Sequence, residues 1–94
     1  MQTVKVPGWN NKHKVLVYAI STCGWCKRAK NFLKDNDVEF EYIDIDLCSW
    51  EDKNKIRQDI QIRGGPLAYP TVIMDNKILL TGASPDNLKE VLEI

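Results

Sequence analysis

Two cysteines separated by two residues carry the clearest chemical signal in the sequence. Cys23 and Cys26 follow an apolar run at residues 15–20 and open a segment with helical periodicity. A thiolate, not a thiol, attacks a disulfide, and free cysteine, with a pKa of about 8.5, is only a few per cent ionised at neutral pH. The unpaired N–H groups at a helix start favour negative charge, so Cys23 is predicted to be the attacking thiol. Cys26, one turn later, can then attack the mixed disulfide that Cys23 forms.

Half of a zinc site is the alternative interpretation of this pair. His13 and Cys48 are the other soft ligands in the chain. His13 precedes the strand at residues 15–20 and the pair follows it, which at about 3.3 Å per residue separates them by roughly 20 Å. The second C-x-x-C or H-x-x-x-H of structural zinc sites is missing from the sequence. The motif therefore indicates redox chemistry, and we expect no metal.

The elements around the pair alternate between strands and helices. Residues 15–20 are continuous and β-rich, as in a strand buried on both faces. A helix should run from the cysteines to about Asn36, and alternating residues predict a strand over 38–46. Ser49, with Asp52 three residues later, has the spacing of a capping box, which predicts a second helix to about residue 60.

The remaining third of the chain predicts a hairpin and a final helix. Residues 71–74 and 78–80 are apolar and are joined by a turn at 75–76. Ser84 as cap and Pro85 at the first helical position begin the last helix. The order is βαβαββα, in which the first βαβ unit implies parallel strands with a right-handed crossover.

Length and charge limit the classes of protein that the chain can be. Ninety-four residues make one domain, and thirteen basic residues balance thirteen acidic ones. This balance argues against nucleic-acid binding, and the longest apolar run is far shorter than the roughly 20 residues that span a bilayer. The first residues lack a signal-peptide profile, and three cysteines fit a secreted disulfide framework poorly. We expect a cytoplasmic monomer that contacts neither membrane nor nucleic acid.

Four ordered motifs resemble those of glutaredoxins. They are Val-Tyr-Ala-Ile-Ser-Thr-Cys-Gly-Trp-Cys-Lys-Arg-Ala-Lys-Asn-Phe-Leu at 17–33, Tyr-Ile-Asp-Ile-Asp at 42–46, Ala-Tyr-Pro-Thr at 68–71 and Gly-Ala-Ser-Pro-Asp at 82–86. The resemblance covers roughly residues 14–93, so 1–13 are treated as an N-terminal extension and 14–94 as the glutaredoxin/thioredoxin-like domain. It implies a thioredoxin-like, three-layer α/β fold with a four-stranded mixed sheet flanked by helices.

The resemblance also implies roles for individual residues. Cys23 would be the nucleophile and Cys26 the resolving thiol, with their redox-active disulfide in place of any cofactor. Pro70 would be cis and face the cysteines, so that the backbone of Tyr69 pairs with an incoming substrate strand. The further substrate-binding candidates are Gly24, Trp25, Gly82, Ser84 and Asp86.

Three departures from the common glutaredoxin pattern narrow the interpretation. Gly24-Trp25 replaces the usual Pro-Tyr, and Ile20 stands where glutathione-binding members carry a basic residue. The Gly-x-x-Pro-Asp pattern at 82–86 is closer to the glutaredoxin-like redoxins that donate electrons to ribonucleotide reductase. That subgroup is reduced by a protein disulfide reductase. We therefore expect reduction of protein disulfides, possible targets including ribonucleotide reductase, with a flavin- or ferredoxin-linked disulfide reductase as donor and glutathione as a poor one.

Other functions stay open at this point. A glutathione-dependent glutaredoxin is one, and an iron–sulfur carrier with Cys23 holding a cluster between two chains is another, although such carriers typically have a single active-site cysteine. A purely structural domain is the third, but no structural role requires two cysteines at a helix start.

Several residues outside the motifs receive structural interpretations. Cys48, expected at the same sheet edge as Cys23, is interpreted as a small buried residue, with a role as an additional resolving thiol as the alternative. Trp50 is expected to pack the second helix, with a role beside the substrate at that edge of the sheet as the alternative. Trp9 and His13 are expected in terminal packing or facing solvent. The four basic residues of the second helix region are expected to form a solvated face, with partner docking as the alternative; they are Lys53, Lys55, Arg57 and Arg63. Asp44 and Asp46 are expected to end a strand without forming an acid–base pair.

Overall fold

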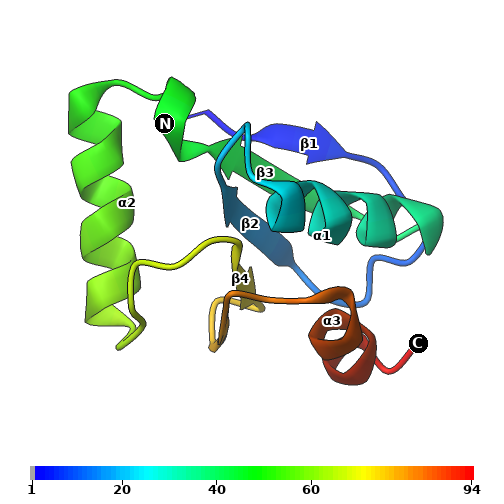
Figure 1. Cartoon of the computed structure of the whole chain (residues 1–94). Helices are drawn as coiled ribbons and strands as arrows, with labels where there is room; N and C mark the ends of the chain where they lie inside the picture. The colour runs from blue at the N-terminus through cyan, green and yellow to red at the C-terminus, as the bar shows by residue number, and fades with distance from the viewer. Residues whose placement is uncertain (1) are drawn as a thin grey trace.

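A mixed sheet of five strands forms the middle layer of the computed structural model, which describes residues 2–94 (Figure 1). The spatial order is β1-β3-β2-β4-β5. Strands β2 and β3 are parallel, and every other neighbouring pair is antiparallel. The strands are β1 (Val4–Val6), β2 (Val15–Ala19), β3 (Phe40–Asp44), β4 (Thr71–Met74) and β5 (Ile78–Thr81).

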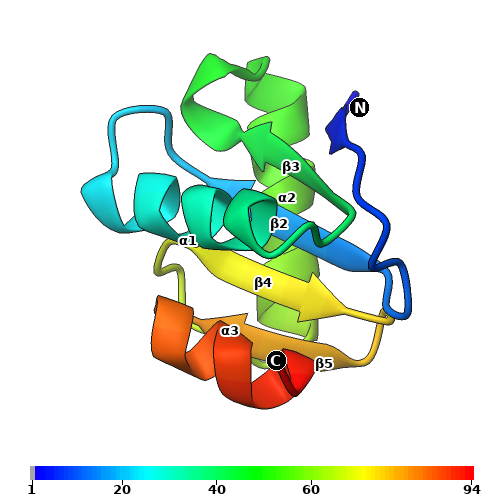
Figure 2. The same cartoon turned by 90° about the vertical axis from the view of Figure 1, so that its right-hand side faces the viewer.

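Helices cover both faces of this sheet. Helices α1 (Gly24–Asp35) and α3 (Pro85–Leu92) lie on one face, and α2 (Trp50–Ile62) lies on the other (Figures 1 and 2). A short 3-10 helix, η1 (Ile45–Leu47), leads from β3 towards α2. Because β2 and β3 are parallel and joined by the βαβ crossover through α1, their C-terminal ends lie at the same edge of the sheet.

The core consists of two apolar clusters, one on each side of the sheet. Between the sheet and helices α1 and α3, Leu33, Phe40 and Leu88 are almost completely buried. Beneath α2, Ile56 and Ile60 pack with residues that include Ile73. Burying a side chain of this size contributes about 1.5–3 kcal/mol, so both faces hold their helices mainly by apolar burial.

The predicted order of elements is confirmed from β2 onward, including the helix starts. The Ser49 hydroxyl accepts a hydrogen bond from the Asp52 N–H at 3.2 Å. The Ser84 hydroxyl accepts from the Asn87 N–H at 3.3 Å, with Pro85 as the first residue of α3. Both caps satisfy N–H groups that a helix leaves unpaired, which is why these serines mark the boundaries correctly.

The prediction of four strands is wrong by one, because the N-terminal segment supplies β1. Val4 pairs with Tyr42 and Val6 with Phe40. The chain then passes so close to the start of β3 that a Cβ at Gly8 would lie 2.3 Å from the Asp37 carbonyl oxygen. Three residues are too few to show strand periodicity, which explains why β1 was missed.

The second predicted strand is also shorter than expected. It was predicted over residues 38–46, whereas β3 ends at Asp44 and the following Ile-Asp-Leu forms η1. The alternation of Val38, Phe40 and Tyr42 is broken at Asp44, and Ile45 is buried in η1 rather than in the strand.

Candidate active site

Cys23 is the residue that caps the start of α1. It has extended backbone angles, φ −79° and ψ 122°, and its Sγ accepts a hydrogen bond from the Cys26 N–H at 3.2 Å. Its own N–H donates to the Ile20 carbonyl at 3.1 Å, which closes the tight turn after β2. The sulfur is half-buried and meets the positive end of the helix dipole. Cys23 therefore presents a half-buried sulfur beside the N–H groups that begin α1.

Cys26 lies in a different environment, although only one turn away. Its side chain is 0% exposed, and it is a thiol like Cys23. Burial, followed by the hydrogen bond with Cys23, raises the pKa of Cys26 to about 12, while a hydrogen bond with the Ile20 backbone and, less strongly, the charge of Lys30 act in the opposite direction. The structure thus brings two thiols together and makes only one of them accessible.

A partly buried ion pair lies behind the first turns of α1. Lys30 Nζ is 2.8 Å from Asp44 Oδ1, and the two side chains are only 14% and 16% exposed. The same ammonium lies 4.0 Å from the centre of the Tyr42 ring. Asp44 was expected only as a strand-end carboxylate, so this ion pair was not predicted.

A carboxylate in η1, that of Asp46, holds the loop before Cys23 in place. Asp46 accepts hydrogen bonds from the Ser21 N–H, at 2.9 Å, and from the Ser21 hydroxyl. These bonds lower the pKa of Asp46, the hydroxyl having the larger effect. Asp46 therefore holds the ends of β2 and β3 together.

The segment before β4 lies beside the cysteines. The Tyr69–Pro70 peptide bond is cis, which confirms that expectation, and Pro70 is buried. The Pro70 carbonyl accepts the Ala83 N–H at 3.0 Å. Tyr69 and Cys23 both pack against the same core cluster. The Pro70–Ala83 hydrogen bond thereby joins the motif at 68–71 to the start of the motif at 82–86, and the first motif shares a core cluster with Cys23.

The other residues predicted to bind substrate differ in how far they are exposed and in the hydrogen bonds that they make. Trp25 is 55% exposed, with the Arg28 guanidinium 4.7 Å from its ring centre. Gly82 has a φ of +59°, which favours glycine at this turn. The Ser84 hydroxyl is used as the α3 cap. Asp86 is exposed, and its side chain makes no hydrogen bond to the cysteines within residues 2–94.

Gly24 opens α1 and is exposed. A Cβ built there would meet no atom within 4 Å, so the absence of the usual proline reflects no steric requirement for glycine.

Two cations on α2 approach the site; both were expected on a solvated face, with partner docking as the alternative. Lys53 and Arg57 line a depression of about 230 Å³. Ile20, Ile45, Asp46 and Tyr69 complete its wall. Residues four apart on a helix lie on the same face. This spacing, together with the common edge at which the parallel strands end, could have predicted that Lys53 and Arg57 lie side by side near the site.

The other basic residues of that face differ. Lys55 is exposed, as expected. Arg63 donates to Asp59 at 3.0 Å and to the Asn76 carbonyl at 3.1 Å, so it ties the end of α2 to the β4–β5 turn.

The remaining residues outside the motifs lie partly where the sequence predicted. Cys48 is half-buried rather than buried; its Sγ donates to the Asp44 carbonyl at 3.5 Å, and burial is the main cause that raises the pKa of Cys48. The expectation that Trp50 packs α2 is wrong, because the ring is 70% exposed at the first position of the helix. Trp9 faces solvent, and His13 Nδ1 lies 2.7 Å from Asp75 Oδ2.

A dithiol at a strand-to-helix turn, beside a cis-proline on a mixed sheet with helices on both faces, defines a thioredoxin-like protein with a thiol-exchange site. The family comparison agrees: the chain belongs to the glutaredoxin family, whose model matches residues 15–79. The match leaves out β1, which ends at Val6.

Individual relatives are similar over the same region. Glutaredoxin 1 of Rickettsia conorii is 31% identical over 64 residues, which are 68% of this chain and 60% of that protein. Glutaredoxin 1 of Rickettsia prowazekii is 30% identical over 64 residues, or 64% of its length. The match therefore spans less than two thirds of these curated relatives.

Solved structures match the whole chain. The methanoredoxin of Methanosarcina acetivorans superposes with a TM-score of 0.87 at 29% identity, covering 100% of this chain and 97% of the other. The glutaredoxin of Methanosarcina mazei Go1 gives 0.86 at 26% identity, covering 100% and 90%. The thioredoxin-like fold is confirmed by both. Within residues 2–94, none of the helices has the length and apolar character needed to cross a membrane.

Proposed function

We propose that the protein reduces disulfides in other proteins by dithiol exchange. The Cys23 thiolate attacks one sulfur of the substrate disulfide, forms a mixed disulfide and releases one substrate thiolate, which takes up a proton. Cys26 loses its proton and attacks the Cys23 sulfur, releasing the second substrate thiolate. The substrate gains two electrons, and the protein loses two as the Cys23–Cys26 disulfide forms.

The observation that carries this proposal is the asymmetry of the two thiols. Cys23 Sγ receives an N–H at the helix start, whereas Cys26 is buried with a pKa of about 12. Two of the causes that raise the pKa of Cys26 are its hydrogen bond with Cys23 and the charge of Cys23. A mixed disulfide at Cys23 removes that charge, while Lys30 continues to lower the pKa of Cys26. Burial, the largest cause of the raised pKa, persists, so the first step removes only part of what keeps Cys26 protonated.

For the electron donor, we propose a flavin- or ferredoxin-linked protein disulfide reductase in the cytoplasm, with the protein acting as a monomer. Ile20 supplies no charge beside the first cysteine, and Pro85 has no N–H at the start of α3. The Ser84 hydroxyl is already used as the cap. Losing one charge-assisted contact costs about 1.5–3 kcal/mol, or roughly ten- to a hundredfold in affinity for glutathione. The Gly-x-x-Pro-Asp pattern supports ribonucleotide reductase as one target.

Glutathione is a second candidate donor, and one observation favours it. Lys53 and Arg57 line the depression that Ile20 and Tyr69 also line. These two cations can hold a carboxylate there without a basic residue at position 20.

One turnover assay separates the two donors. A disulfide-bonded protein substrate is supplied with catalytic amounts of this protein and either a flavoprotein disulfide reductase or millimolar glutathione with its own reductase. Fast turnover with the flavoprotein and slow turnover with glutathione support our proposal. Fast turnover with glutathione and none with the protein reductase would assign the glutathione-dependent function instead. No turnover with either would refute disulfide reduction itself.

A further inference from the structure

Two large apolar side chains are exposed at the end of the sheet that carries the cysteines. Leu47 in η1 is 74% exposed, and Trp50 at the first position of α2 is 70% exposed. Neither side chain belongs to the two core clusters of the described residues. Tryptophan is the residue type most enriched among those that dominate the affinity of protein interfaces.

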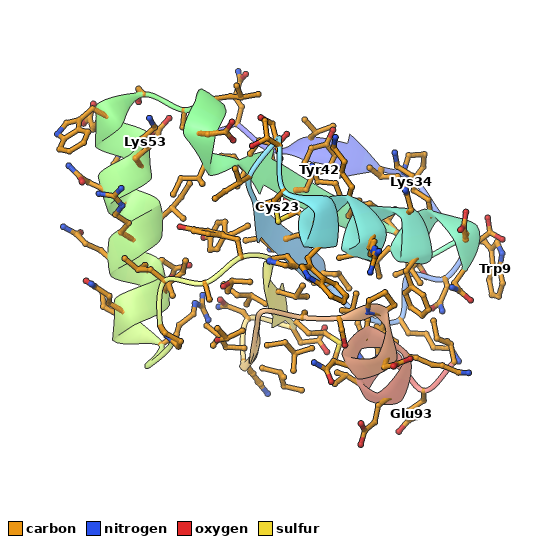
Figure 3. All side chains as sticks on the ribbon, viewed as in Figure 1. Trp9, Cys23, Lys34, Tyr42, Lys53 and Glu93 are labelled. Carbon is orange, nitrogen blue, oxygen red and sulfur yellow. The ribbon has the colours of Figure 1, made fainter. Side chains whose placement is uncertain are left out.

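Helix geometry makes Trp50 continuous with the depression beside the active site. Trp50, Lys53 and Arg57 are spaced i, i+3 and i+7, which places them on one face of α2. The Arg57 guanidinium carbon lies 6.0 Å from the Trp50 ring centre. Figure 3 shows Lys53 near the N-terminal end of α2 and Cys23 at the start of α1.

The charges on this face are available to a partner. Within residues 2–94, Lys53 and Arg57 take part in none of the ion pairs. Asp46, the acidic residue of the depression, already accepts two hydrogen bonds from Ser21. Glu51 and Asp52 lie in the first turn of α2, where they complement the positive end of its dipole.

We propose that Leu47, Trp50, Lys53 and Arg57 form a docking surface for an acidic segment of the partner protein that also carries an apolar side chain. The carboxylate enters the depression between Lys53 and Arg57, and the apolar side chain covers Trp50 and Leu47. This inference rests on the proposed reduction of protein disulfides. Glutathione offers carboxylates but has no large apolar side chain, so it leaves the Trp50–Leu47 part uncovered.

The first test compares two equally exposed tryptophans. Trp50→Ala and Trp9→Ala are assayed on a disulfide-bonded protein substrate and on a small disulfide, hydroxyethyl disulfide, with folding checked by circular dichroism. We expect Trp50→Ala to lower kcat/KM for the protein substrate by about tenfold and to spare the small disulfide, as expected for the loss of an interface anchor. Trp9→Ala should change neither. Equal values for the two variants on the protein substrate, or parallel losses by Trp50→Ala on both substrates, would overturn the docking surface.

The second test addresses the chemistry of the partner. A disulfide-linked peptide pair is made in two versions, with glutamate or with lysine flanking the cysteine. The glutamate version should react several-fold faster, and Arg57→Glu should reverse this preference, whereas the matched charge reversal Lys55→Glu should keep it. Equal rates for the two peptides would overturn the acidic partner.

These outcomes differ from a failure of the proposed function. If disulfide reduction itself is wrong, wild-type protein and Cys23→Ser will be equally inactive on every substrate. If only the docking surface is wrong, Cys23→Ser alone will be inactive and Trp50→Ala will match Trp9→Ala.

Discussion

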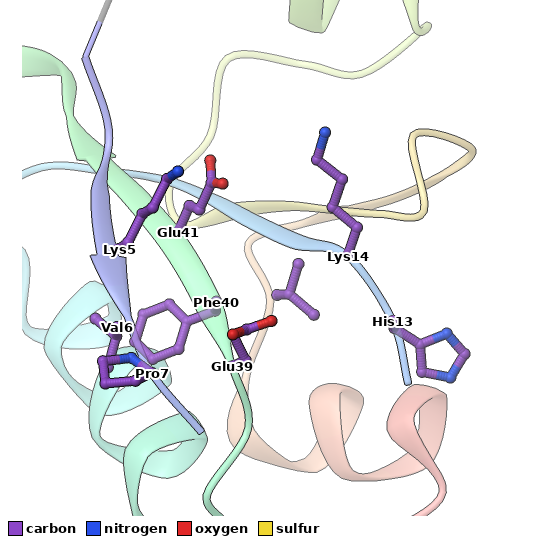
Figure 4. Close-up of a pocket in the computed structure, with 9 residues that line it drawn as sticks. Lys5, Val6, Pro7, His13, Lys14, Glu39, Phe40 and Glu41 are labelled. Atoms are coloured by element: carbon purple, nitrogen blue, oxygen red, sulfur yellow. The ribbon is translucent and has the colours of Figure 1, made fainter. Parts of the chain in front are cut away.

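Two hollows within residues 2–94 can be compared, and the larger of these two is not the one beside the cysteines. The groove in Figure 4 has a volume of about 280 Å³ and lies where β1 ends and where β2 and β3 begin. Its lining includes both charge signs, with Lys5, Lys14, Glu39 and Glu41. The depression beside the cysteines is smaller, about 230 Å³, and lies where β2 and β3 end.

The comparison of the two hollows indicates that the position of the reactive cysteine, and not the volume of the hollow, is the better guide to the candidate active site. At the ends of β2 and β3 the chain turns into helices, so N–H groups and the dipole of α1 point at Cys23. At the strand beginnings the groove has no cysteine in its lining. Ligands of open α/β folds characteristically bind at the C-terminal ends of parallel strands.

The largest expected effect is the loss of the attacking thiol. Cys23→Ser should abolish disulfide reduction, because a hydroxyl cannot replace the thiolate. His13→Ala, which changes the lining of the larger groove, should leave the rate within about twofold. Steady-state reduction of a protein disulfide measures both, and a greater loss with His13→Ala would reverse our ranking of the two hollows.

A smaller effect is expected behind the active-site helix. Lys30→Met leaves Asp44 without its ion-pair partner in a site that is about 15% exposed, and should destabilise the fold by about 1–3 kcal/mol. The exposed Lys27→Met on the same helix should cost about 0.5 kcal/mol or less. Urea unfolding compares the two variants. Equal midpoints would show that the Lys30–Asp44 pair contributes nothing.

Acid should weaken the hydrogen bonds of one carboxylate at each end of the sheet. Ser21 bonds lower the pKa of Asp46, and the Lys14 N–H, followed by His13, lowers the pKa of Asp75. Because both pKa values are depressed in the fold, their stabilisation is present above the unfolded value of about 3.9 and is lost as pH falls through the folded values. Asp46→Asn and Asp75→Asn should each reduce the decline in thermal midpoint below about pH 4. A decline identical to that of the wild type would show that these two carboxylates do not contribute to the pH dependence of stability.

The smallest effect is expected at the third cysteine. Cys48→Ser should keep disulfide reduction within about twofold, since Cys48 contacts the Asp44 carbonyl and packs beneath α2. Single-turnover oxidation followed by mass spectrometry should find the Cys23–Cys26 disulfide in both proteins. A disulfide that includes Cys48 in the wild type would give it a part in the mechanism.

The sequence was sufficient where a local signal determines structure. The serine caps of α2 and α3 and the position of Cys23 at a helix start depend on neighbouring residues, and all three are confirmed. The cis peptide before Pro70 is confirmed as well, but it followed from the family resemblance rather than from local signals.

Features that depend on tertiary contacts were missed. Strand β1 is defined by its pairing with β3, and the Lys30–Asp44 pair joins a helix to a strand. The expected packing of Trp50 failed because α2 is held by only two buried isoleucines, so an aromatic residue at its start is free to face outward. These properties depend on which surfaces meet, which composition and periodicity do not specify.

The most direct test of the central claim is the order in which the thiols react. Reduced wild-type protein is exposed briefly to iodoacetamide at pH 7, and each cysteine is quantified by peptide mass spectrometry. Cys23 should be modified first and Cys26 last, because Cys26 is fully buried with a pKa of about 12. Modification of Cys26 as fast as Cys23 would contradict the assignment of attacking and resolving thiols.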